Sequence, residues 1–112
     1  MKALFVCSRN QWRSPTAEEL FRNERGWKTR SCGTAKSAKR RASAGLIAWA
    51  DLICCMERRH AEMLRQRFGE VLTGKHIAVL DIPDEYRRDD PDLVLELRAA
   101  VERELRELDL IG

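Results

Sequence analysis

Residues 2–21 read KALFVCSRNQWRSPTAEELF, and the character of this stretch changes twice along its length. Lys2–Val6 is a short apolar run rich in β-forming residues, which is typical of a buried strand. Polar residues follow over Ser8–Ser14. Pro15 then suits the first turn of a helix, where its missing N–H costs nothing. Beyond it, apolar residues recur on one helical face, at Ala17, Leu20 and Phe21. This stretch therefore predicts a strand, a polar loop and a helix.

The same alternation continues along the rest of the chain. We expect further strands over Trp27–Cys32, Leu52–Met56 and Ile77–Leu80. We expect further helices over Leu46–Ala50, over Glu57–Phe68, and from Pro91 onward with Asp90 as its cap. Strands that alternate with helices predict an α/β fold, here a four-stranded parallel sheet with helices on both faces.

Length and composition limit the class of protein. A chain of 112 residues fits one domain, 1–112, and is 44% hydrophobic and 35% charged. These fractions are those of a soluble globular protein. No apolar run approaches the roughly 20 residues of a membrane span, and the N-terminus does not resemble a signal peptide. We expect a cytoplasmic protein that makes no membrane contact and acts as a monomer.

The chain has four cysteines, Cys7, Cys32, Cys54 and Cys55. None forms a C-x-x-C pair of the kind that binds zinc, and the adjacent Cys54 and Cys55 are poorly placed for a disulfide. In a reducing cytosol we expect four free thiols, with those inside the predicted strands buried as small apolar groups. We expect neither a metal nor another cofactor.

Positive charge is concentrated in the first half of the chain, although the net charge is only +3. The residues concerned are Arg9, Arg13, Lys36, Lys39, Arg40 and Arg41. Two interpretations stay open. The charges could form a solvated face, or they could attract an anionic partner such as a phosphorylated substrate or a nucleic acid.

Cys7 and Arg13 form the spacing C-x5-R across the predicted strand-to-helix loop. In such a loop successive backbone N–H groups can converge on an anion, so we expect a phosphate-binding loop after the first strand. The helix N-terminus also favours the thiolate form of Cys7, which is the nucleophile. The planar fork of Arg13 can grip two phosphate oxygens.

Other residues of the loop have expected roles in the same chemistry. Ser14 can donate a hydrogen bond to the sulfur and help it leave, and Asn10 tolerates the left-handed backbone that a cradle requires. The predicted substrate-binding residues of the loop are Ser8, Arg9, Asn10, Gln11, Trp12 and Ser14.

These motifs together resemble the low-molecular-weight protein tyrosine phosphatase family. The similar stretches are Leu4–Cys7, Asn10, Arg13–Glu18, Ser31–Thr34, Ala50–Ile53 with Met56 and His60, and Asp81–Tyr86. They occur in the family's order over nearly the whole chain. The resemblance implies hydrolysis of a phosphotyrosine-containing protein or a small aryl phosphate through a phosphocysteine.

The resemblance also implies a role for each catalytic residue. Cys7 is the implied nucleophile, Arg13 the phosphate clamp and Asp84 the general acid. Members of the family usually have Asp-Pro-aromatic in the acid loop, whereas this chain has Asp84-Glu85-Tyr86. Asp81 and Glu85 therefore stay open as rivals to Asp84.

Three departures from the family pattern affect the substrate pocket. Trp12 replaces the second loop cysteine of many members and could wall the pocket or pack on a helix. Arg9 replaces a small residue. The chain is shorter between Thr34 and Ala50, which predicts a more open site. Tyr86 could line the pocket or anchor its loop.

Two alternative functions stay open. Arsenate reduction on the same fold would need further cysteines to resolve a covalent intermediate, and the predicted burial of Cys32, Cys54 and Cys55 argues against it. A non-catalytic module that binds phosphate or nucleic acid is the other alternative, and Cys7 with Asn10 and Arg13 argues against it. We expect His60 and His76 to be structural.

Overall fold

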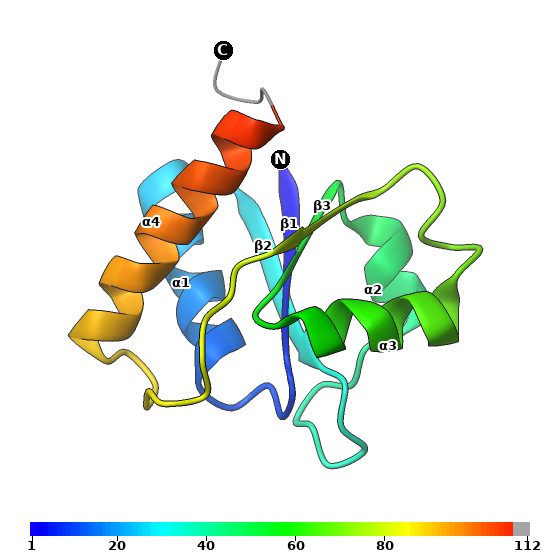
Figure 1. Cartoon of the computed structure of the whole chain (residues 1–112), viewed down its shortest axis with the longest axis horizontal. Coiled ribbons are helices and arrows are strands. Elements are labelled where there is room, and N and C mark those ends of the chain that lie inside the picture. The colour runs from blue at the N-terminus through cyan, green and yellow to red at the C-terminus, as the bar shows by residue number, and fades with distance from the viewer. Residues whose placement is uncertain (109–112) are drawn as a thin grey trace.

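The computed structural model describes residues 1–108, which alternate between strands and helices throughout. In chain order the elements are β1 (Lys2–Cys7), α1 (Arg13–Arg25), β2 (Lys28–Gly33), α2 (Ala44–Trp49), β3 (Leu52–Cys55), α3 (Arg58–Phe68), β4 (His76–Val79) and α4 (Pro91–Glu107). The predicted order is confirmed, with boundaries that differ by one or two residues at most ends (Figure 1).

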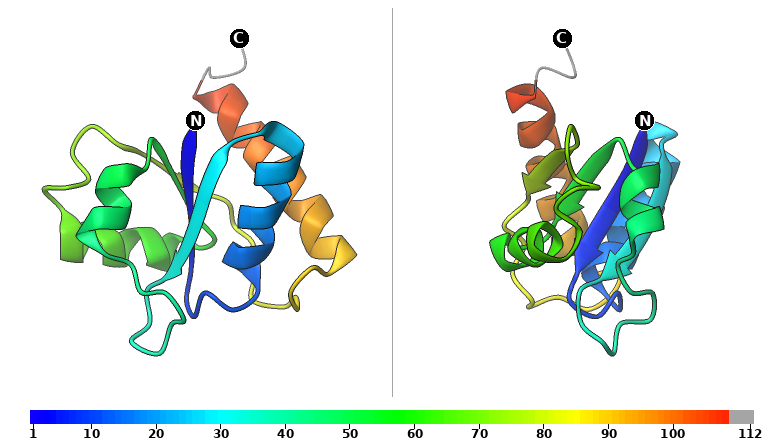
Figure 2. Two further views of the ribbon diagram at one scale, coloured as in Figure 1. Left: turned by 180° about the vertical axis from the view of Figure 1, so that it is seen from behind. Right: turned by 90° about the vertical axis from the view of Figure 1, so that its right-hand side faces the viewer.

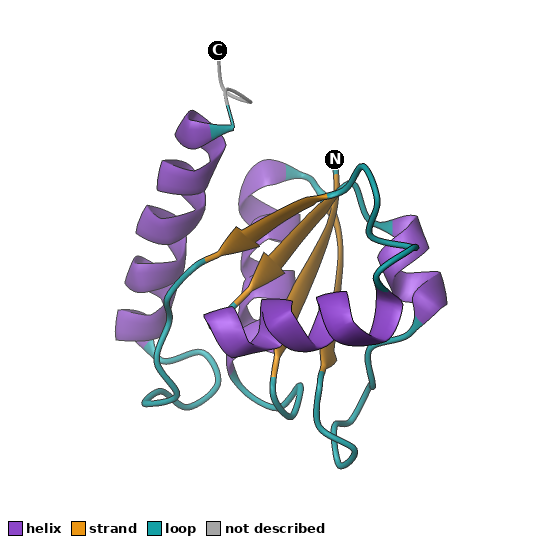
Figure 3. Cartoon of the chain, turned by 45° about the vertical axis from the view of Figure 1, so that its right-hand side comes forward, coloured by secondary structure: helices purple, strands orange, loops and turns teal. Residues whose placement is uncertain are grey.

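The four strands form one parallel sheet in the order β2-β1-β3-β4. Val6 of the central strand β1 pairs with Cys32 on one side and with Cys55 on the other. Figure 3 shows the strands fanning out with their arrowheads pointing the same general way. The carboxyl ends of all four strands therefore lie along one edge, where open α/β sheets bind ligands.

Helices cover both faces of the sheet, as predicted (Figure 2). Because side chains alternate along a strand, Phe5 and Cys7 of β1 point to one face, while Leu4 and Val6 point to the other. The first face packs on α1 and α4, and the second packs on α2 and α3. The β1 side chains are thus buried on both sides, which explains the continuous apolar run in the sequence.

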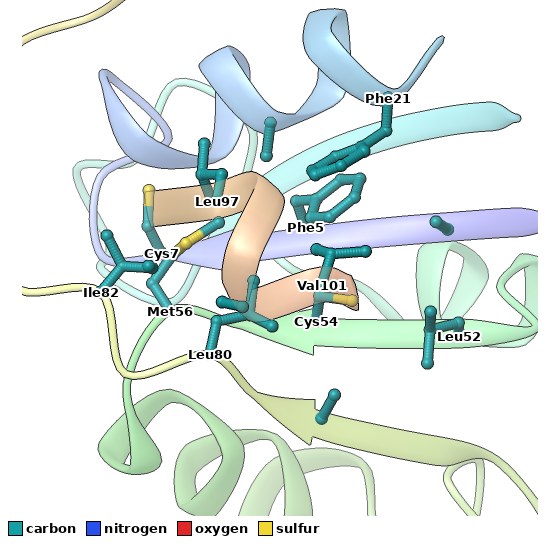
Figure 4. Packing of buried hydrophobic residues seen from close by; sticks show 14 of the residues in the cluster. Phe5, Cys7, Phe21, Leu52, Cys54, Met56, Leu80, Ile82, Leu97 and Val101 are labelled. Atoms are coloured by element: carbon teal, nitrogen blue, oxygen red, sulfur yellow. The ribbon is translucent and has the colours of Figure 1, made fainter. Parts of the chain in front are cut away.

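Aromatic stacking supports the face that carries Cys7. The ring centroids of Phe5 and Phe21 lie 5.4 Å apart, and Trp27 stacks on Phe21 at 5.8 Å. Figure 4 shows Cys7 at the end of β1 in the same cluster as Met56 and Leu97. Burying such a phenyl ring stabilises the fold by about 1.5–3 kcal/mol, so β1 and α1 are firmly joined below the site.

Helix ends follow the local chemistry expected from the sequence. The Asp90 side chain accepts a hydrogen bond from the Asp92 N–H at 2.9 Å, and Pro91 occupies the first turn of α4. Helix α1 ends at Gly26, whose φ of 64° suits glycine. Helix α2 begins earlier than predicted, because Ser43 caps it by accepting the Leu46 N–H. Among residues 1–108, no helix is long and apolar enough to cross a membrane.

Candidate active site

The loop of residues 8–12 joins β1 to α1 at the carboxyl edge of the sheet. Asn10 has a φ of 54°, the left-handed conformation expected for a residue that turns a cradle. None of the hydrogen bonds formed within residues 1–108 has a backbone N–H of residues 8–12 as its donor. Unpaired N–H groups at the start of a helix form a ready anion site.

A pocket of about 360 Å³ opens beside this loop. Its lining consists of Cys7, Ser8, Arg9, Gln11, Trp12, Arg13, Arg59 and Asp84. The predicted nucleophile, clamp and acid are therefore brought together around one hollow. Cys7 is only 3% exposed, whereas Trp12 is 40% exposed, so the sulfur lies deep and the indole lies near the surface. Of the two alternatives for Trp12, its position fits a pocket wall.

A chain of buried hydrogen bonds leads to the Cys7 sulfur. The sulfur lies 3.0 Å from Ser14 Oγ, and Asn10 Nδ2 donates to the same oxygen at 3.0 Å. Asn10 Nδ2 also donates to Ser31 Oγ at 2.8 Å, and Ser31 in turn donates to Glu18 Oε1 at 2.6 Å. Ser14 Oγ therefore accepts from Asn10 and has two possible acceptors for its own hydrogen, the Cys7 sulfur and the Cys32 carbonyl at 3.4 Å. Asn10 and Ser14 thus lie behind the loop rather than in the pocket lining.

Arg13 is buried and held in a fixed orientation. Its side chain is 2% exposed, and Nη1 donates to Glu57 Oε2 at 2.6 Å and to the Ile82 carbonyl at 2.8 Å. Hydrogen bonds from Arg59 and then from Arg13 lower the pKa of Glu57 to about 2. Nη2 of Arg13 has no hydrogen-bond partner within residues 1–108, so it is available to a ligand.

His60 supports the loop from the first turn of α3. Its Nδ1 accepts the Glu57 N–H at 3.0 Å, so in the neutral ring Nε2 carries the proton and donates to Ser8 Oγ at 2.9 Å. Burial, followed by the charges of Arg13 and Arg59, lowers the pKa of His60 to about 4. The ring is therefore neutral near pH 7.

The structure separates the three rival carboxylates. Asp84 lines the pocket, and its Oδ1 lies 3.8 Å from Arg13 Nε. Asp81 lines a different groove, between the end of β4 and α4, and Glu85 does not line the pocket. Tyr86 packs against the hydrophobic core and is also absent from the pocket lining. Its position fits the loop anchor and not the predicted contact with substrate.

The remaining cysteines are buried away from the pocket, as predicted. Burial raises the pKa of Cys32 and of Cys55 to about 12 and raises the pKa of Cys54 as well. Such thiols are poor nucleophiles, which disfavours the resolving chemistry of an arsenate reductase. Within residues 1–108, no three His, Cys, Asp or Glu side chains cluster closely enough to hold a metal ion.

Sequence reasoning missed the supporting roles of Glu57, Arg59 and His60. His60 was expected to be structural, and the structure ties it to the phosphate loop through Ser8. The available signal was the order of elements, since these residues directly follow β3, whose carboxyl end neighbours that of β1. His76, in contrast, lies exposed at the start of β4, on the opposite edge of the sheet.

Comparisons with known proteins identify the fold. No protein-family model and no curated protein matches the chain. Among solved structures, the tyrosine phosphatase Wzb from Escherichia coli K30 has a TM-score of 0.74 and 24% identity, covering 96% of this chain and 97% of that one. A low-molecular-weight phosphotyrosine phosphatase from Vibrio cholerae O395 has a TM-score of 0.74 and 20% identity, covering 100% and 99%.

An arginine phosphatase shares the same architecture. YwlE from Geobacillus stearothermophilus has a TM-score of 0.70 and 22% identity, covering 97% of this chain and 93% of that one. The chain therefore has the fold of low-molecular-weight protein tyrosine phosphatases over nearly its whole length, and the resemblance predicted from its motifs is confirmed at the level of fold.

Proposed function

We propose that this chain, with its low-molecular-weight phosphatase fold, is a cysteine-dependent protein tyrosine phosphatase that hydrolyses aryl phosphates through a phosphocysteine on Cys7. The observation that carries the proposal is the pocket itself. One hollow contains the Cys7 thiol, the Arg13 guanidinium and the Asp84 carboxyl, beside a loop whose N–H groups have no acceptor among residues 1–108. These are the groups that transfer of a phosphoryl group to sulfur requires.

In the first step the Cys7 thiolate attacks phosphorus. The S–P bond forms while the P–O bond to the aryl group breaks, and protonated Asp84 gives its proton to the departing phenolate oxygen. Arg13 Nη2 and the loop N–H groups bind the three equatorial oxygens. Since Glu57 and the Ile82 carbonyl already hold the guanidinium, it needs little reorganisation during the reaction.

In the second step water hydrolyses the phosphocysteine. The Asp84 carboxylate takes a proton from the water, whose oxygen attacks phosphorus as the S–P bond breaks. The Ser14 hydroxyl, 3.0 Å from the sulfur, stabilises the departing thiolate by donating a hydrogen bond. The products are inorganic phosphate and the free thiolate, so the cycle balances with water as its only co-substrate.

The substrate we propose is a phosphotyrosine-containing protein or a small aryl phosphate. The indole of Trp12 lines the pocket and is 40% exposed, so it offers an apolar surface to a phenyl ring. The four free thiols suit a reducing compartment such as the cytoplasm, and we propose that the protein acts there as a monomer.

Trapping the intermediate tests this proposal. The protein would be mixed briefly with an aryl phosphate in the presence of a metal chelator, quenched in acid and digested for mass spectrometry. We expect a phosphate adduct on the Cys7 peptide, none in Cys7→Ala under the same acid quench at matched times, and a normal adduct in the buried control Cys54→Ser. Full turnover by Cys7→Ala, or an adduct on another cysteine, would disprove the mechanism.

A further inference from the structure

A basic segment is fixed against the phosphate loop. The Ala35 N–H donates to the Ser8 carbonyl at 2.9 Å, and the Lys39 N–H donates to the Arg9 carbonyl at 3.1 Å. A side chain at Gly33 would collide with the Ser8 carbonyl and with the Ala38 methyl. The backbone at Gly33 therefore lies as close to the phosphate loop as two backbones can. Figure 1 shows this segment below the sheet, at the same edge as the loop after β1.

This arrangement holds a segment rich in cations against the loop that lines the pocket, and Arg9 and Arg59 line the pocket itself. We define the cationic rim as Arg9, Lys36, Lys39, Arg40, Arg41 and Arg59, all of which are exposed. Within residues 1–108 the first five make no ion pair. Arg59 is oriented by Glu57, which accepts from its Nε at 3.2 Å and from its Nη2 at 3.1 Å, and its Nη1 has no partner in the described part of the chain.

The rim is poorly compensated by negative charge. In the pocket lining, Arg9, Arg13 and Arg59 face a single carboxylate, Asp84. Glu57 is already shared by Arg13 and Arg59. Arg9 and the four cations of residues 36–41 therefore keep their positive charge unpaired among the described residues, and the resulting potential acts on whatever part of the substrate lies outside the pocket.

We propose that the cationic rim selects phosphotyrosine sites whose neighbouring residues are acidic. This inference rests on the proposed function and names the substrate class for the same pocket. A phosphotyrosine in the pocket places its flanking residues over the rim, where Asp and Glu side chains meet unpaired guanidinium and ammonium groups.

The strength of the preference for acidic flanking residues depends on how exposed the rim cations are. A single exposed ion pair contributes at most about 1 kcal/mol, so no one cation decides the preference. Several cations around one mouth act together, mainly by steering association, and steering can raise association rates by about 10-fold or more at low salt. Because the Debye length is only ~8 Å at physiological ionic strength, the preference must weaken as salt rises.

Matched phosphopeptides provide the test. Three phosphotyrosine peptides of equal length would carry Glu, Gln or Lys at the flanking positions, and kcat/KM would be measured at low and high ionic strength. We expect the Glu peptide to exceed the Gln peptide by about 10-fold at low salt, the Lys peptide to be poorest, and the differences to shrink at high salt. Equal values for the three peptides, or a preference for Lys, would overturn the inference.

Charge-removal variants locate the preference. In Lys36→Gln/Lys39→Gln and in Arg9→Gln we expect the Glu-to-Gln ratio to fall toward one. The control Lys28→Gln/Arg103→Gln removes two exposed cations away from the pocket and should keep the wild-type ratio. If both double variants reduce the ratio equally, the net charge and not the rim is responsible, and the inference is wrong.

Two further measurements separate this inference from other readings. Hydrolysis of p-nitrophenyl phosphate tests the proposed function alone, since this substrate has no flanking residues. If it is hydrolysed while the three peptides do not differ, only the inference on the rim fails. An RNA oligonucleotide that inhibits more strongly than an unphosphorylated Glu peptide would assign the rim to nucleic acid and overturn the inference.

Discussion

The loop after β1 and the loop after β4 both contribute to the pocket, but they are built differently. Behind the first loop, Asn10, Arg13 and Ser14 are buried, and each is fixed by at least two hydrogen bonds. On the second loop, the Asp84 side chain is 58% exposed, and its carboxylate forms a loose ion pair with Arg13 at 3.8 Å. One side of the site is preorganised, and the other is open to solvent.

This difference indicates how the two halves of the reaction are divided. Gripping a phosphate requires donors that are already in position, because preorganised dipoles stabilise the transition state without rearranging. Proton transfer requires a carboxyl that reaches the leaving group in the first step and the attacking water in the second. We therefore expect substitutions behind the first loop to impair both folding and activity, and substitutions on the second loop to impair activity alone.

The largest effect is expected at Arg13. Arg13→Lys keeps the charge but loses the fork that reaches phosphate and Glu57 together, so kcat/KM for p-nitrophenyl phosphate should fall by about 10³-fold or more. The thermal midpoint should fall as well, because the Ile82 carbonyl loses its donor. Wild-type turnover in this variant would contradict a preorganised clamp.

Asp84→Asn should reduce activity without reducing stability. We expect kcat for a phosphotyrosine peptide to fall by about 10²–10³-fold, because the phenolate then leaves without a proton. The loss should be smaller for p-nitrophenyl phosphate, whose leaving group needs less assistance. Asp81→Asn and Glu85→Gln are the matched controls, and a greater loss in either one would transfer the acid role to that residue.

The pH dependence of the unfolding free energy should show whether the His60 ring is neutral in the folded protein. Its pKa of about 4 lies below the ordinary value of 6.5, so the folded protein binds fewer protons than the unfolded chain. His60 therefore has no effect on the unfolding free energy above about pH 6.5. As pH falls toward 4, protonation of this histidine in the unfolded chain lowers the unfolding free energy by up to on the order of 3 kcal/mol. Urea denaturation at several pH values would compare wild type with His60→Gln. Parallel curves would contradict a buried neutral ring, and the exposed His76→Gln is the control.

The smallest effect is expected at Glu57. Glu57→Gln keeps an acceptor near Arg13 but removes the charge, so the unfolding free energy should fall by about 1–2 kcal/mol. KM should rise several-fold as the guanidinium loosens. Glu102→Gln removes the same charge from an exposed pair with Arg106 and should change stability by less than about 0.5 kcal/mol. Equal losses of unfolding free energy in the two variants would show that the burial of Arg13 does not strengthen its ion pair with Glu57.

Much of this site could be predicted from the sequence, because the residues of the phosphate loop are close neighbours in the chain. Cys7, Asn10 and Arg13 lie within one strand-loop-helix unit, so their spacing alone brings them around a single turn. The acid loop is remote in sequence, and its three carboxylates could not be ranked from the chain. In the structure Asp84 lines the pocket that contains Cys7, whereas Asp81 lines the groove beside α4.

The amino-acid sequence by itself determined the alternation of strands and helices, the parallel sheet and the position of the loop after β1, because hydrophobic periodicity and turn chemistry act over a few neighbouring residues. Only the tertiary structure decided that Glu57 and His60 hold the loop, that Tyr86 packs against the hydrophobic core, and that residues 35–41 lie against Ser8 and Arg9. These contacts join residues far apart in the chain, and the order of strands in the sheet determines which of them meet.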